Sequence, residues 1–501
     1  MKTWTRKEFL KTSALAAGAA WLSGCSTTPA AAPAVRTARR ASPNDDVRVA
    51  IVGIRGKGAQ HIGLFRGLPG VKVAALCEVD SEIMAKHVRA FDDRGEKVAA
   101  YRDYRDLLDD PTIDAVVVAT PNHWHSLMSV WACQAGKDVY LEKPISHNVW
   151  EGRKTVEAAA RYGRIVQAGI QSRSDDALRE VFALVQAGEL GRVQWVRGLC
   201  YKLRPSIGKT SGPQRIPASI DYDLWTGPAA LVPPHRNSEN GTVHYDWHWL
   251  WNYGGGDIAN QGIHEVDMCR RALGQAGLPP RVTSIGGRFG YDDDAETPNT
   301  QIAIFDYEPA PLIFEVRGLP RKAAERAMDA YRGTRVGLSI QCEHGYFAGG
   351  GGGGAFYDNS GKQMRRFSSA GGGGHAANFI AAVRSRRSED LAGRILDGHV
   401  SSALCHLANI SYRLGTETDN ARIREMIAAH APTADSFGRM LEHLRANEVD
   451  VDASRTVLGP SLDFDPNSER FIVRESFDFG HFANTMLRRD YRAPFVVPEN
   501  V

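Results

Sequence analysis

Cysteine is scarce in this chain, and its placement excludes two classes of structure. The 501 residues contain seven cysteines, with no C-x-x-C pair and no cysteine beside a histidine cluster. The sequence therefore predicts neither a zinc site nor a disulfide framework, and we expect no bound metal. Cys77 and Cys133 lie in apolar runs, where a small buried side chain is the ordinary role of cysteine.

An excess of one charge and long apolar runs are also lacking. The net charge is only +3, from 61 basic and 58 acidic residues. No basic stripe accompanies it, so we expect no nucleic-acid partner. Beyond residue 25 no segment reaches about 18 apolar residues, so no transmembrane helix is expected. The length allows two or three domains.

Residues 1–25 resemble an export signal with a lipobox. A basic start precedes an Ala-rich run that is too short to span a membrane, and Thr5 to Lys11 resembles a twin-arginine signal with Lys7 in place of the second Arg. In the run Leu22-Ser23-Gly24-Cys25, Cys25 is the residue that would carry the lipid.

Residues 26–46, rich in Ala, Pro, Ser and Thr, predict a flexible linker. We therefore expect an exported protein, periplasmic or lipid-anchored to the bacterial envelope. Its only membrane contact would be the N-terminal anchor. The alternative is an ordinary disordered N-terminus.

A glycine-rich turn follows the first apolar strand of the chain, residues 47–52. It contains Gly53, Arg55, Gly56 and Gly58, and a helical stretch comes directly after it. Such a turn lets backbone N–H groups approach a pyrophosphate at the start of the helix. The spacing is G-x-x-G-x-G rather than G-x-G-x-x-G, so this motif alone is a weak signal.

Glu78 ends the second predicted strand, about 25 residues after Gly53. An acid at this point binds both ribose hydroxyls of adenosine and repels a 2′-phosphate, which favours NAD over NADP. The alternative is a surface acid at the end of a strand.

The run 113–120 is continuously apolar, as expected for a strand buried on both faces. Thr120, Pro121, Asn122 and His125 follow, and we expect them at the cofactor. For Asn122 and His125, capping of the next helix is an equal alternative. The alternation of strands and helices predicts a doubly wound parallel sheet.

Glu142-Lys143-Pro144 closes the strand 138–141. Ligands of parallel sheets bind beyond the carboxyl ends of the strands. Pro144 forces Lys143 into an extended conformation, so this lysine is held at the sheet edge. We interpret Lys143 as a residue placed for chemistry.

Together these motifs resemble the Gfo/Idh/MocA family of sugar and cyclitol oxidoreductases, over about residues 47–415. The resemblance implies an α/β protein. Residues 47–148 would form an NAD-binding Rossmann domain, and 149–415 an α/β substrate domain with a large open, mostly antiparallel sheet. Residues 416–501 would form a C-terminal helical extension and tail.

The resemblance also implies roles for single residues. Lys143 would be catalytic beside the nicotinamide, with Glu142 and Gln171 at the cofactor and Arg173 facing the substrate. Homo-oligomers are common in the family, so we expect one here.

The substrate half is rich in predicted strands. The runs 193–203, 281–290, 299–307, 311–318 and 335–341 fit one antiparallel or mixed sheet. The glycine runs 349–354 and 371–374 predict flexible loops.

Trp247 and Trp249 belong to a dense aromatic stretch, 243–251, that could stack on sugar rings or form a buried core. Asn260 and His264 follow, four apart, on one face of a predicted helix. In the resembled family this helix carries an Asp and a His that join the lysine in proton transfer. His264 matches, whereas the amide of Asn260 cannot accept a proton, so we expect Asn260 only to bind substrate.

These residues predict an NAD-dependent oxidoreductase acting on a sugar or cyclitol hydroxyl. Burial beside a cationic nicotinamide lowers the pKa of Lys143, and His264 would titrate near neutrality. Because NAD is not exchangeable outside the cytoplasm, we expect it to stay bound and to be recycled. The alternatives are a redox-neutral, NAD-dependent glycoside hydrolase and a non-catalytic sugar-binding lipoprotein.

Overall fold

The computed structural model describes residues 46–236, 243–475 and 478–501. All of them belong to one compact unit, Thr37–Val501. The predicted export signal, Cys25 and all but the last residue of the predicted linker lie outside the described residues. Across the described ranges no helix is long and apolar enough to cross a membrane, and no cluster of residues could hold a metal ion. The six cysteines in these ranges are buried and unpaired.

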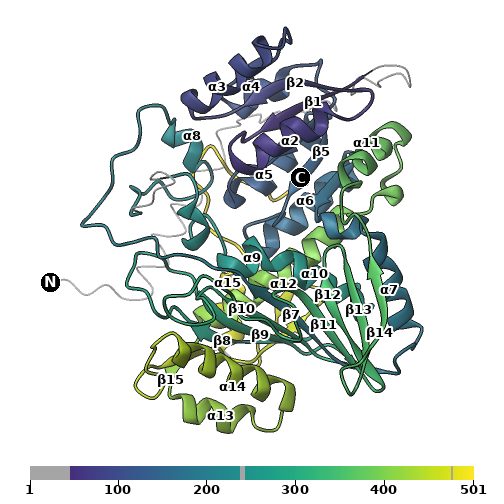
Figure 1. Ribbon diagram of the computed structural model, residues 1–501. Coiled ribbons are helices and arrows are strands. Elements are labelled where there is room, and N and C mark those ends of the chain that lie inside the picture. The colour runs from purple at the N-terminus through teal and green to yellow at the C-terminus, as the bar shows by residue number, and fades with distance from the viewer. Residues whose placement is uncertain (1–45, 237–242, 476–477) are drawn as a thin grey trace, which may run out of the picture. The chain divides into compact units, whose positions relative to one another are not determined.

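The first half of the unit is a six-stranded parallel sheet in the order β3-β2-β1-β4-β5-β6. Its central strands are buried throughout because helices cover both faces (Figure 1). This confirms the predicted Rossmann fold. The last strand lies beyond residue 148, where we had expected the domain to end. The strands are β1 (Val47–Val52), β2 (Val71–Cys77), β3 (Ala99–Tyr101), β4 (Ala115–Val118), β5 (Asp138–Glu142) and β6 (Val166–Gly169).

Short polar side chains start several helices of this half. Asp80 accepts a hydrogen bond from the backbone of Glu82, and Asn148 accepts one from Glu151. These caps satisfy N–H groups that the helix itself leaves free. The helices are α2 (Gly56–Arg66), α3 (Ser81–Asp92), α4 (Tyr104–Asp109), α5 (His125–Gln134) and α6 (Val149–Arg161), with a 3₁₀ turn at Asn122–Trp124.

The second sheet has twelve strands, of which ten run in the order β14-β13-β12-β11-β7-β10-β9-β8-β16-β15. Only the pair β7 and β10 is parallel, which confirms the predicted large, mostly antiparallel sheet. The strands are β7 (Val193–Tyr201), β8 (Arg281–Gly287), β9 (Thr300–Phe305), β10 (Leu312–Arg317), β11 (Val336–Cys342), β12 (Gly345–Gly350), β13 (Gly353–Asp358), β14 (Gln363–Ser368), β15 (Thr416–Thr418), β16 (Thr456–Leu458), β17 (Leu462–Asp465) and β18 (Arg470–Phe471).

The expected loop at 349–354 is wrong. These glycines end β12, form a two-residue turn and begin β13. A Cβ on Gly349 would lie 2.3 Å from the carbonyl oxygen of Gly353, so only glycine allows this close pairing. A glycine run that looks like a flexible loop is here a tight hairpin.

Helices α7, α10 and α12 share one apolar core with the large sheet and lie between the two sheets (Figure 1). Helices α13 and α14 pack on the other face, against β8, β9 and β10. The helices of this half are α7 (Asp176–Gln186), α8 (Tyr222–Thr226), α9 (Gly256–Asn260), α10 (Gly262–Ala272), α11 (His375–Ser385), α12 (Ile395–Arg413), α13 (Asn420–Ile427), α14 (Ala431–Ala446) and α15 (Phe479–Thr485), and 3₁₀ turns occur at Gln171–Ser174, Asp246–Trp249 and Ser388–Asp390.

The C-terminal segment is more than helices and a tail. It adds β15 to β18, of which β16 and β17 both pair with β8. Its last residues then return to the Rossmann half, where Phe495, Val497 and Val501 are buried in the core. We call residues 488–501 the tail.

A long connection joins β7 to α9, and we call its described residues, 202–236 and 243–255, the cover segment. At Ser219 to Asp221 it forms backbone hydrogen bonds with the end of β2, and His244 contacts Asp80 at 3.1 Å. Arg492 of the tail holds the same segment by donating to Gly227 and Asp223. The cover segment is thus fixed over the carboxyl edge of the parallel sheet.

Candidate functional site

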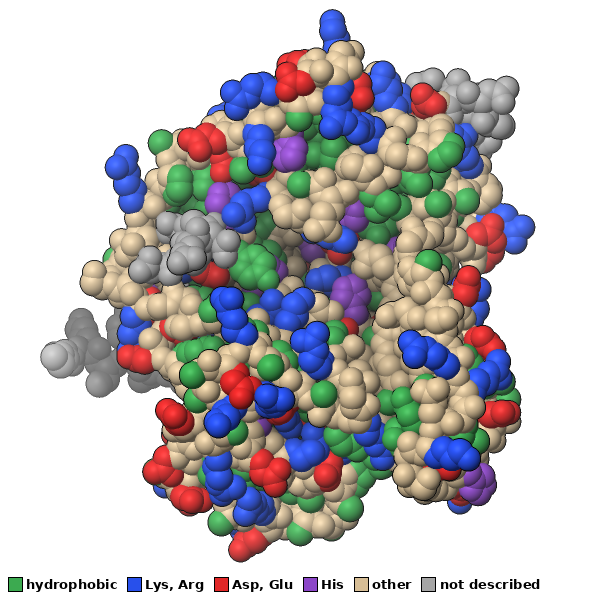
Figure 2. All heavy atoms as spheres, viewed as in Figure 1, with side chains coloured by type: hydrophobic (Ala, Val, Ile, Leu, Met, Phe, Trp, Pro, Cys, Tyr) green, Lys and Arg blue, Asp and Glu red, His purple; other side chains and the backbone are tan. Residues whose placement is uncertain are grey.

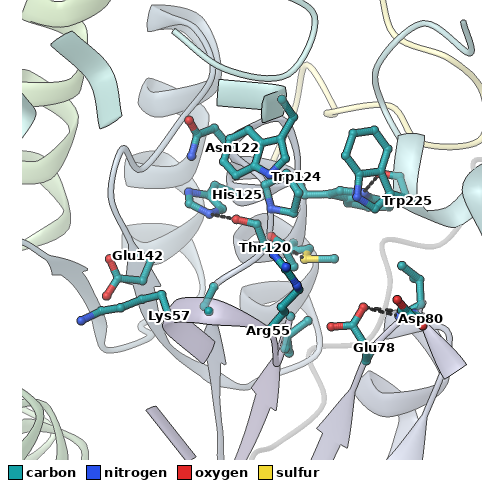
Figure 3. A pocket seen from close by; sticks show the side chains of 18 of the residues that line it. Arg55, Lys57, Glu78, Asp80, Thr120, Asn122, Trp124, His125, Glu142 and Trp225 are labelled. Atoms are coloured by element: carbon teal, nitrogen blue, oxygen red, sulfur yellow. Dashed lines mark hydrogen bonds between the residues drawn. The ribbon is translucent and has the colours of Figure 1, made fainter. Parts of the chain in front are cut away.

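A cavity of about 320 Å³ lies between the carboxyl edge of the parallel sheet and the cover segment. Figure 2 shows the corresponding hollow in the middle of one face, and Figure 3 shows its lining. We call it the cofactor cavity. Twelve of the predicted site residues line it: Gly53, Arg55, Gly56, Glu78, Thr120, Pro121, Asn122, His125, Glu142, Lys143, Trp247 and Asn260.

The glycine-rich turn is shaped for close backbone approach. Gly53 has φ +74°, and a Cβ on Gly58 would lie 1.8 Å from the carbonyl oxygen of Gly53. No side chain caps the start of α2, so its first N–H groups remain available to a phosphate. Gly58 acts through this packing, because it is not among the residues that line the cavity.

Glu78 stands at the other end of the cavity from Glu142 (Figure 3). Its carboxylate accepts hydrogen bonds from the backbone N–H groups of Ile54, Val79 and Asp80, at 2.8 to 3.1 Å. Burial raises the pKa of Glu78, and these bonds oppose the rise. Fixed at the end of β2, the carboxylate is where an adenosine ribose would meet it.

Lys143 leaves the end of β5 and reaches across to the second half of the protein. Its Nζ donates to the backbone oxygen of Asn260 at 2.5 Å. Burial lowers the pKa of Lys143, while the carboxylates of Glu142 and Glu265 counteract the shift. A lysine in this position exchanges protons more readily than a solvated one.

Glu142 is only 4% exposed, yet its carboxylate is well satisfied. It accepts from His61 at 2.8 Å and from Gln171 at 3.1 Å, and it also faces Lys143. Burial raises its pKa, but the hydrogen bond and charge of His61 and the charge of Lys143 overcome this and hold the pKa far below its usual range. Glu142 therefore stays ionised.

His125 holds the lysine segment in place. One ring nitrogen lies 2.6 Å from the carbonyl oxygen of Pro144 and the other 2.8 Å from that of Thr120. The ring links the ends of β4 and β5, as Figure 3 shows for Thr120. Helix α12 fixes the next residues, because Ile145 donates to Ser402 at 3.1 Å and His406 contacts Ser146.

The cover segment supplies site residues that the sequence did not reveal. Tyr245 and His248 line the cofactor cavity with Lys143, and Leu224 and Trp225 line it with Tyr104. Burial lowers the pKa of His248 to about 3, and Lys143 and Arg204 add to the shift. For Tyr245 and His248 the sequence signal was the aromatic density of 243–251.

The predicted helix that carries Asn260 and His264 is interrupted. Asn260 is the last residue of α9, Gln261 is a turn, and α10 begins at Gly262. The expected single helix is thus two helices joined through Gln261, and a shared face for Asn260 and His264 stays a prediction. Asn260 lines the cofactor cavity, whereas His264 lines a different one.

We call this other space, of about 520 Å³, the second cavity. It lies beside the first turn of α10, and Gln171, Gln261, His264 and Glu265 contribute to its wall. Burial and the charge of Lys143 lower the pKa of His264 to about 3. His264 is therefore neutral at physiological pH, and our expectation that it titrates near neutrality is wrong.

Arg173 and the two tryptophans are placed differently from the expectation. Arg173 pairs with Asp267 at 2.7 Å and with Asp397 at 3.1 Å, and it is absent from the lining of either cavity. These ion pairs hold Arg173 against α10 and α12. Trp247 lines the cofactor cavity, whereas Trp249 is buried against Arg204. A substrate role for Arg173 or Trp249 stays a prediction without support from these contacts.

Comparison with known families agrees with the geometry. Residues 47–170 match the model of the Gfo/Idh/MocA oxidoreductase family, NAD-binding Rossmann fold, and residues 178–310 match the C-terminal alpha/beta domain of the same family. NAD is thus the cofactor of the first half, and the glycine turn and Glu78 fit it.

Similar curated proteins carry two kinds of name. A Glycosyl hydrolase family 109 protein 2 from Shewanella sp. (strain ANA-3) is 28% identical over 47% of this chain and 54% of its own length. An Inositol 2-dehydrogenase from Salmonella typhimurium is 27% identical over 36% of this chain and 52% of its own length. The chain spans about half the length of the curated relatives it matches.

Solved structures share the fold. The WlbA dehydrogenase from Bordetella pertussis, in complex with NADH and UDP-GlcNAcA, aligns with TM-score 0.52 and 18% identity over 72% of this chain and 94% of its own. An oxidoreductase domain protein from Kribbella flavida aligns with TM-score 0.54 and 19% identity over 73% and 96%.

Proposed function

This chain belongs to the Gfo/Idh/MocA oxidoreductase family, and on that premise we propose that it oxidises a hydroxyl group of a sugar or cyclitol with tightly bound, internally recycled NAD. The observation that carries the proposal is Lys143. It stands at the cofactor cavity, is fixed by the contacts of its neighbours and has a lowered pKa. When bound, NAD would accept a hydride from a carbinol carbon and return it to a carbonyl carbon of the same or of a second sugar.

The chain's own part of the reaction is to bind, orient and move a proton. In its uncharged form, the Nζ of Lys143 accepts the proton of the substrate hydroxyl. Glu142 remains ionised and stabilises the ammonium form that results. Asn260 anchors Nζ through its backbone oxygen, and its side-chain amide can bind the substrate but cannot take a proton.

Cofactor retention is supported by the cover segment and the tail. The cover segment is hydrogen-bonded to the end of β2, and Arg489 of the tail contacts Glu151 at 3.1 Å and the carbonyl oxygen of His123 at 2.9 Å. An NAD molecule under such a cover leaves slowly, because release requires these contacts to open. Purification without added cofactor, followed by an absorbance spectrum and mass of the denatured supernatant, tests this. An empty protein would contradict retention.

A redox-neutral glycoside hydrolase is the second candidate, favoured by relatives whose names place them in a glycosyl hydrolase family. Transient oxidation to a keto group acidifies a neighbouring C–H, elimination expels the aglycone, water adds to the double bond that results, and the hydride is then returned to the keto carbon. An aryl glycoside assay on the NAD-loaded protein without an acceptor separates the two. Aglycone release that Lys143→Ala abolishes favours the hydrolase, and its absence, with hydrogen–deuterium exchange at a carbinol carbon, favours the oxidoreductase.

We further propose that the protein is exported and anchored through Cys25, in the periplasm or on the bacterial envelope, and that it assembles as a homo-oligomer. Export and anchoring rest on the motifs of residues 1–25. Metabolic labelling with a palmitate analogue tests the anchor, with Cys25→Ser as the control. Light scattering of the purified protein tests assembly, and a monomer would contradict it.

A further inference from the structure

The break between α9 and α10 divides the site between two cavities. Asn260, before the break, lines the cofactor cavity with Lys143, and Gln261, His264 and Glu265, after it, line the second cavity. The electrostatic influence of Lys143 reaches both His264 and Glu265. Because Asn260 and Gln261 are neighbours in the chain, the two cavities approach each other at this break.

Glu265 is the unusual group in the second cavity. Its residue is only 3% exposed, and its Oε2 has no hydrogen-bond partner among the described residues. Its Oε1 accepts a single bond, from Gln261 at 3.1 Å, and Gln261 in turn accepts from Lys202 at 2.9 Å. A buried polar atom without a partner costs free energy, so its retention points to a ligand that completes it.

Ser172 provides a second group of this kind. Its Oγ is buried, has no partner in the part of the chain that the structure describes, and belongs to the lining of the same cavity. Across the cavity, Gly351 and Gly352 form the tip of the β12–β13 hairpin, and nothing lies within 4 Å of where a Cβ of Gly351 would stand. Two unsatisfied polar atoms thus border an open space.

The chemistry of this space favours an uncharged ligand. Burial raises the pKa of Glu265 to about 8, so its carboxyl group is mostly protonated at neutral pH. A protonated carboxyl and a serine hydroxyl each donate and accept, as a sugar hydroxyl does. Asp175, the other acid of the lining, is already satisfied by Gly352 at 2.7 Å and Ser369 at 2.6 Å.

We propose that the second cavity is a binding site for the part of the substrate beyond the oxidised ring, a neutral hydroxylated unit such as a second sugar, anchored by Glu265 and Ser172. The inference rests on the proposed function and deepens it, since it makes the preferred substrate a glycoside of two units rather than a single ring.

The test compares two-unit and one-unit ligands on the NAD-loaded protein. Calorimetry measures the binding of gluco-, galacto- and manno-configured disaccharides and of the matching methyl glycosides. We expect the dissociation constant of the disaccharide to rise about tenfold in Glu265→Met and about threefold in Ser172→Ala. The dissociation constant of the methyl glycoside should not change in either variant. Glu265→Gln, which keeps a donor and an acceptor, should recover most of the binding.

The amount of bound NAD and the midpoint of thermal unfolding are measured for each variant to verify that it is folded. Equal weakening of both ligands, no weakening, or a wild type that binds no disaccharide better than its methyl glycoside would overturn the site. Failure of the proposed function is separate: a wild type that shows Glu265-dependent disaccharide binding but exchanges no hydride with any of these ligands retains the site and loses the activity.

Discussion

Two buried glutamates flank Lys143, and the structure treats them in opposite ways. Glu142, at the edge of the parallel sheet, accepts from His61, from Gln171 and from the Lys143 backbone, and its pKa is held far below the usual range. Glu265, in α10, accepts one bond, and burial raises its pKa to about 8. Equal burial therefore does not decide the charge of an acid; the number of donors aimed at it does.

The difference assigns two tasks to one residue type. An ionised Glu142 stabilises a cation next to it through every pH at which the protein works. A protonated Glu265 adds no charge to its cavity and can meet a neutral hydroxyl. Both carboxylates raise the pKa of Lys143, which lies between them. A substitution at any of the three residues should therefore shift the pKa values of the other two.

Lys143 lies between the two glutamates, and its replacement should lower the activity more than any other change proposed below. We expect Lys143→Met to lower turnover of the substrate about a thousandfold, because the group that accepts the proton is lost. Bound NAD should be retained. Lys154→Met is the matched control, since Lys154 pairs with Glu157 on the surface of α6. Unchanged turnover in Lys143→Met would remove the proposed role.

Glu142→Gln replaces the glutamate whose carboxylate accepts several hydrogen bonds. The loss of a buried, hydrogen-bonded carboxylate should cost about 3 kcal/mol of unfolding free energy at neutral pH. Since the folded pKa is depressed, this contribution is present above the unfolded pKa of about 4.5 and is lost as the pH falls toward the folded value. Urea denaturation at pH 7 and pH 3 measures it, and a loss of the same size at both values would contradict the assignment.

Glu265→Gln replaces the glutamate that has few hydrogen-bond donors. Its effect on the stability of the fold should depend on pH in the opposite direction. A raised folded pKa contributes stability that is complete below about 4.5 and lost as the pH rises through about 8. The variant should therefore melt a few degrees higher than the wild type at pH 9 and close to it at pH 5. Thermal unfolding of both proteins between pH 5 and pH 9 measures this difference. A constant difference in melting temperature across the range would show that Glu265 does not titrate there.

Asn260→Asp sharpens the comparison by adding a third acid at Lys143, with the smallest expected effect. The new charge should raise the pKa of Lys143 and move the acid limb of the pH–rate profile upward by about one unit. Asn260→Ala lacks the charge and should leave the limb in place. A shift in both variants would indicate a loss of packing instead.

The sequence predicted the parallel sheet because the pattern of each strand can be recognised within a few residues. The apolar run 113–120, the glycine turn at Gly53 and the acid at Glu78 each report on structure within a few residues. Lys143 was found by the same means, since a strand end followed by proline fixes a position without long-range information.

The rest depends on contacts between distant segments. The break at Gln261 precedes Gly262, where a Cβ would lie 2.8 Å from the ring of Phe314 in the large sheet, a contact that the local sequence does not show. Glu265 was not among the predicted site residues, since nothing local shows that its donors are missing. The glycines at 349–354 were misread because a strand without side chains has no alternation to detect.

The return of the tail has a consequence for biosynthesis. Phe495, Val497 and Val501 belong to the core of the nucleotide-binding half, which begins at β1. The ribosome makes these residues more than 300 positions after β6, the last strand of that sheet. The first half of the protein therefore completes this core only after residues 495–501 have been translated.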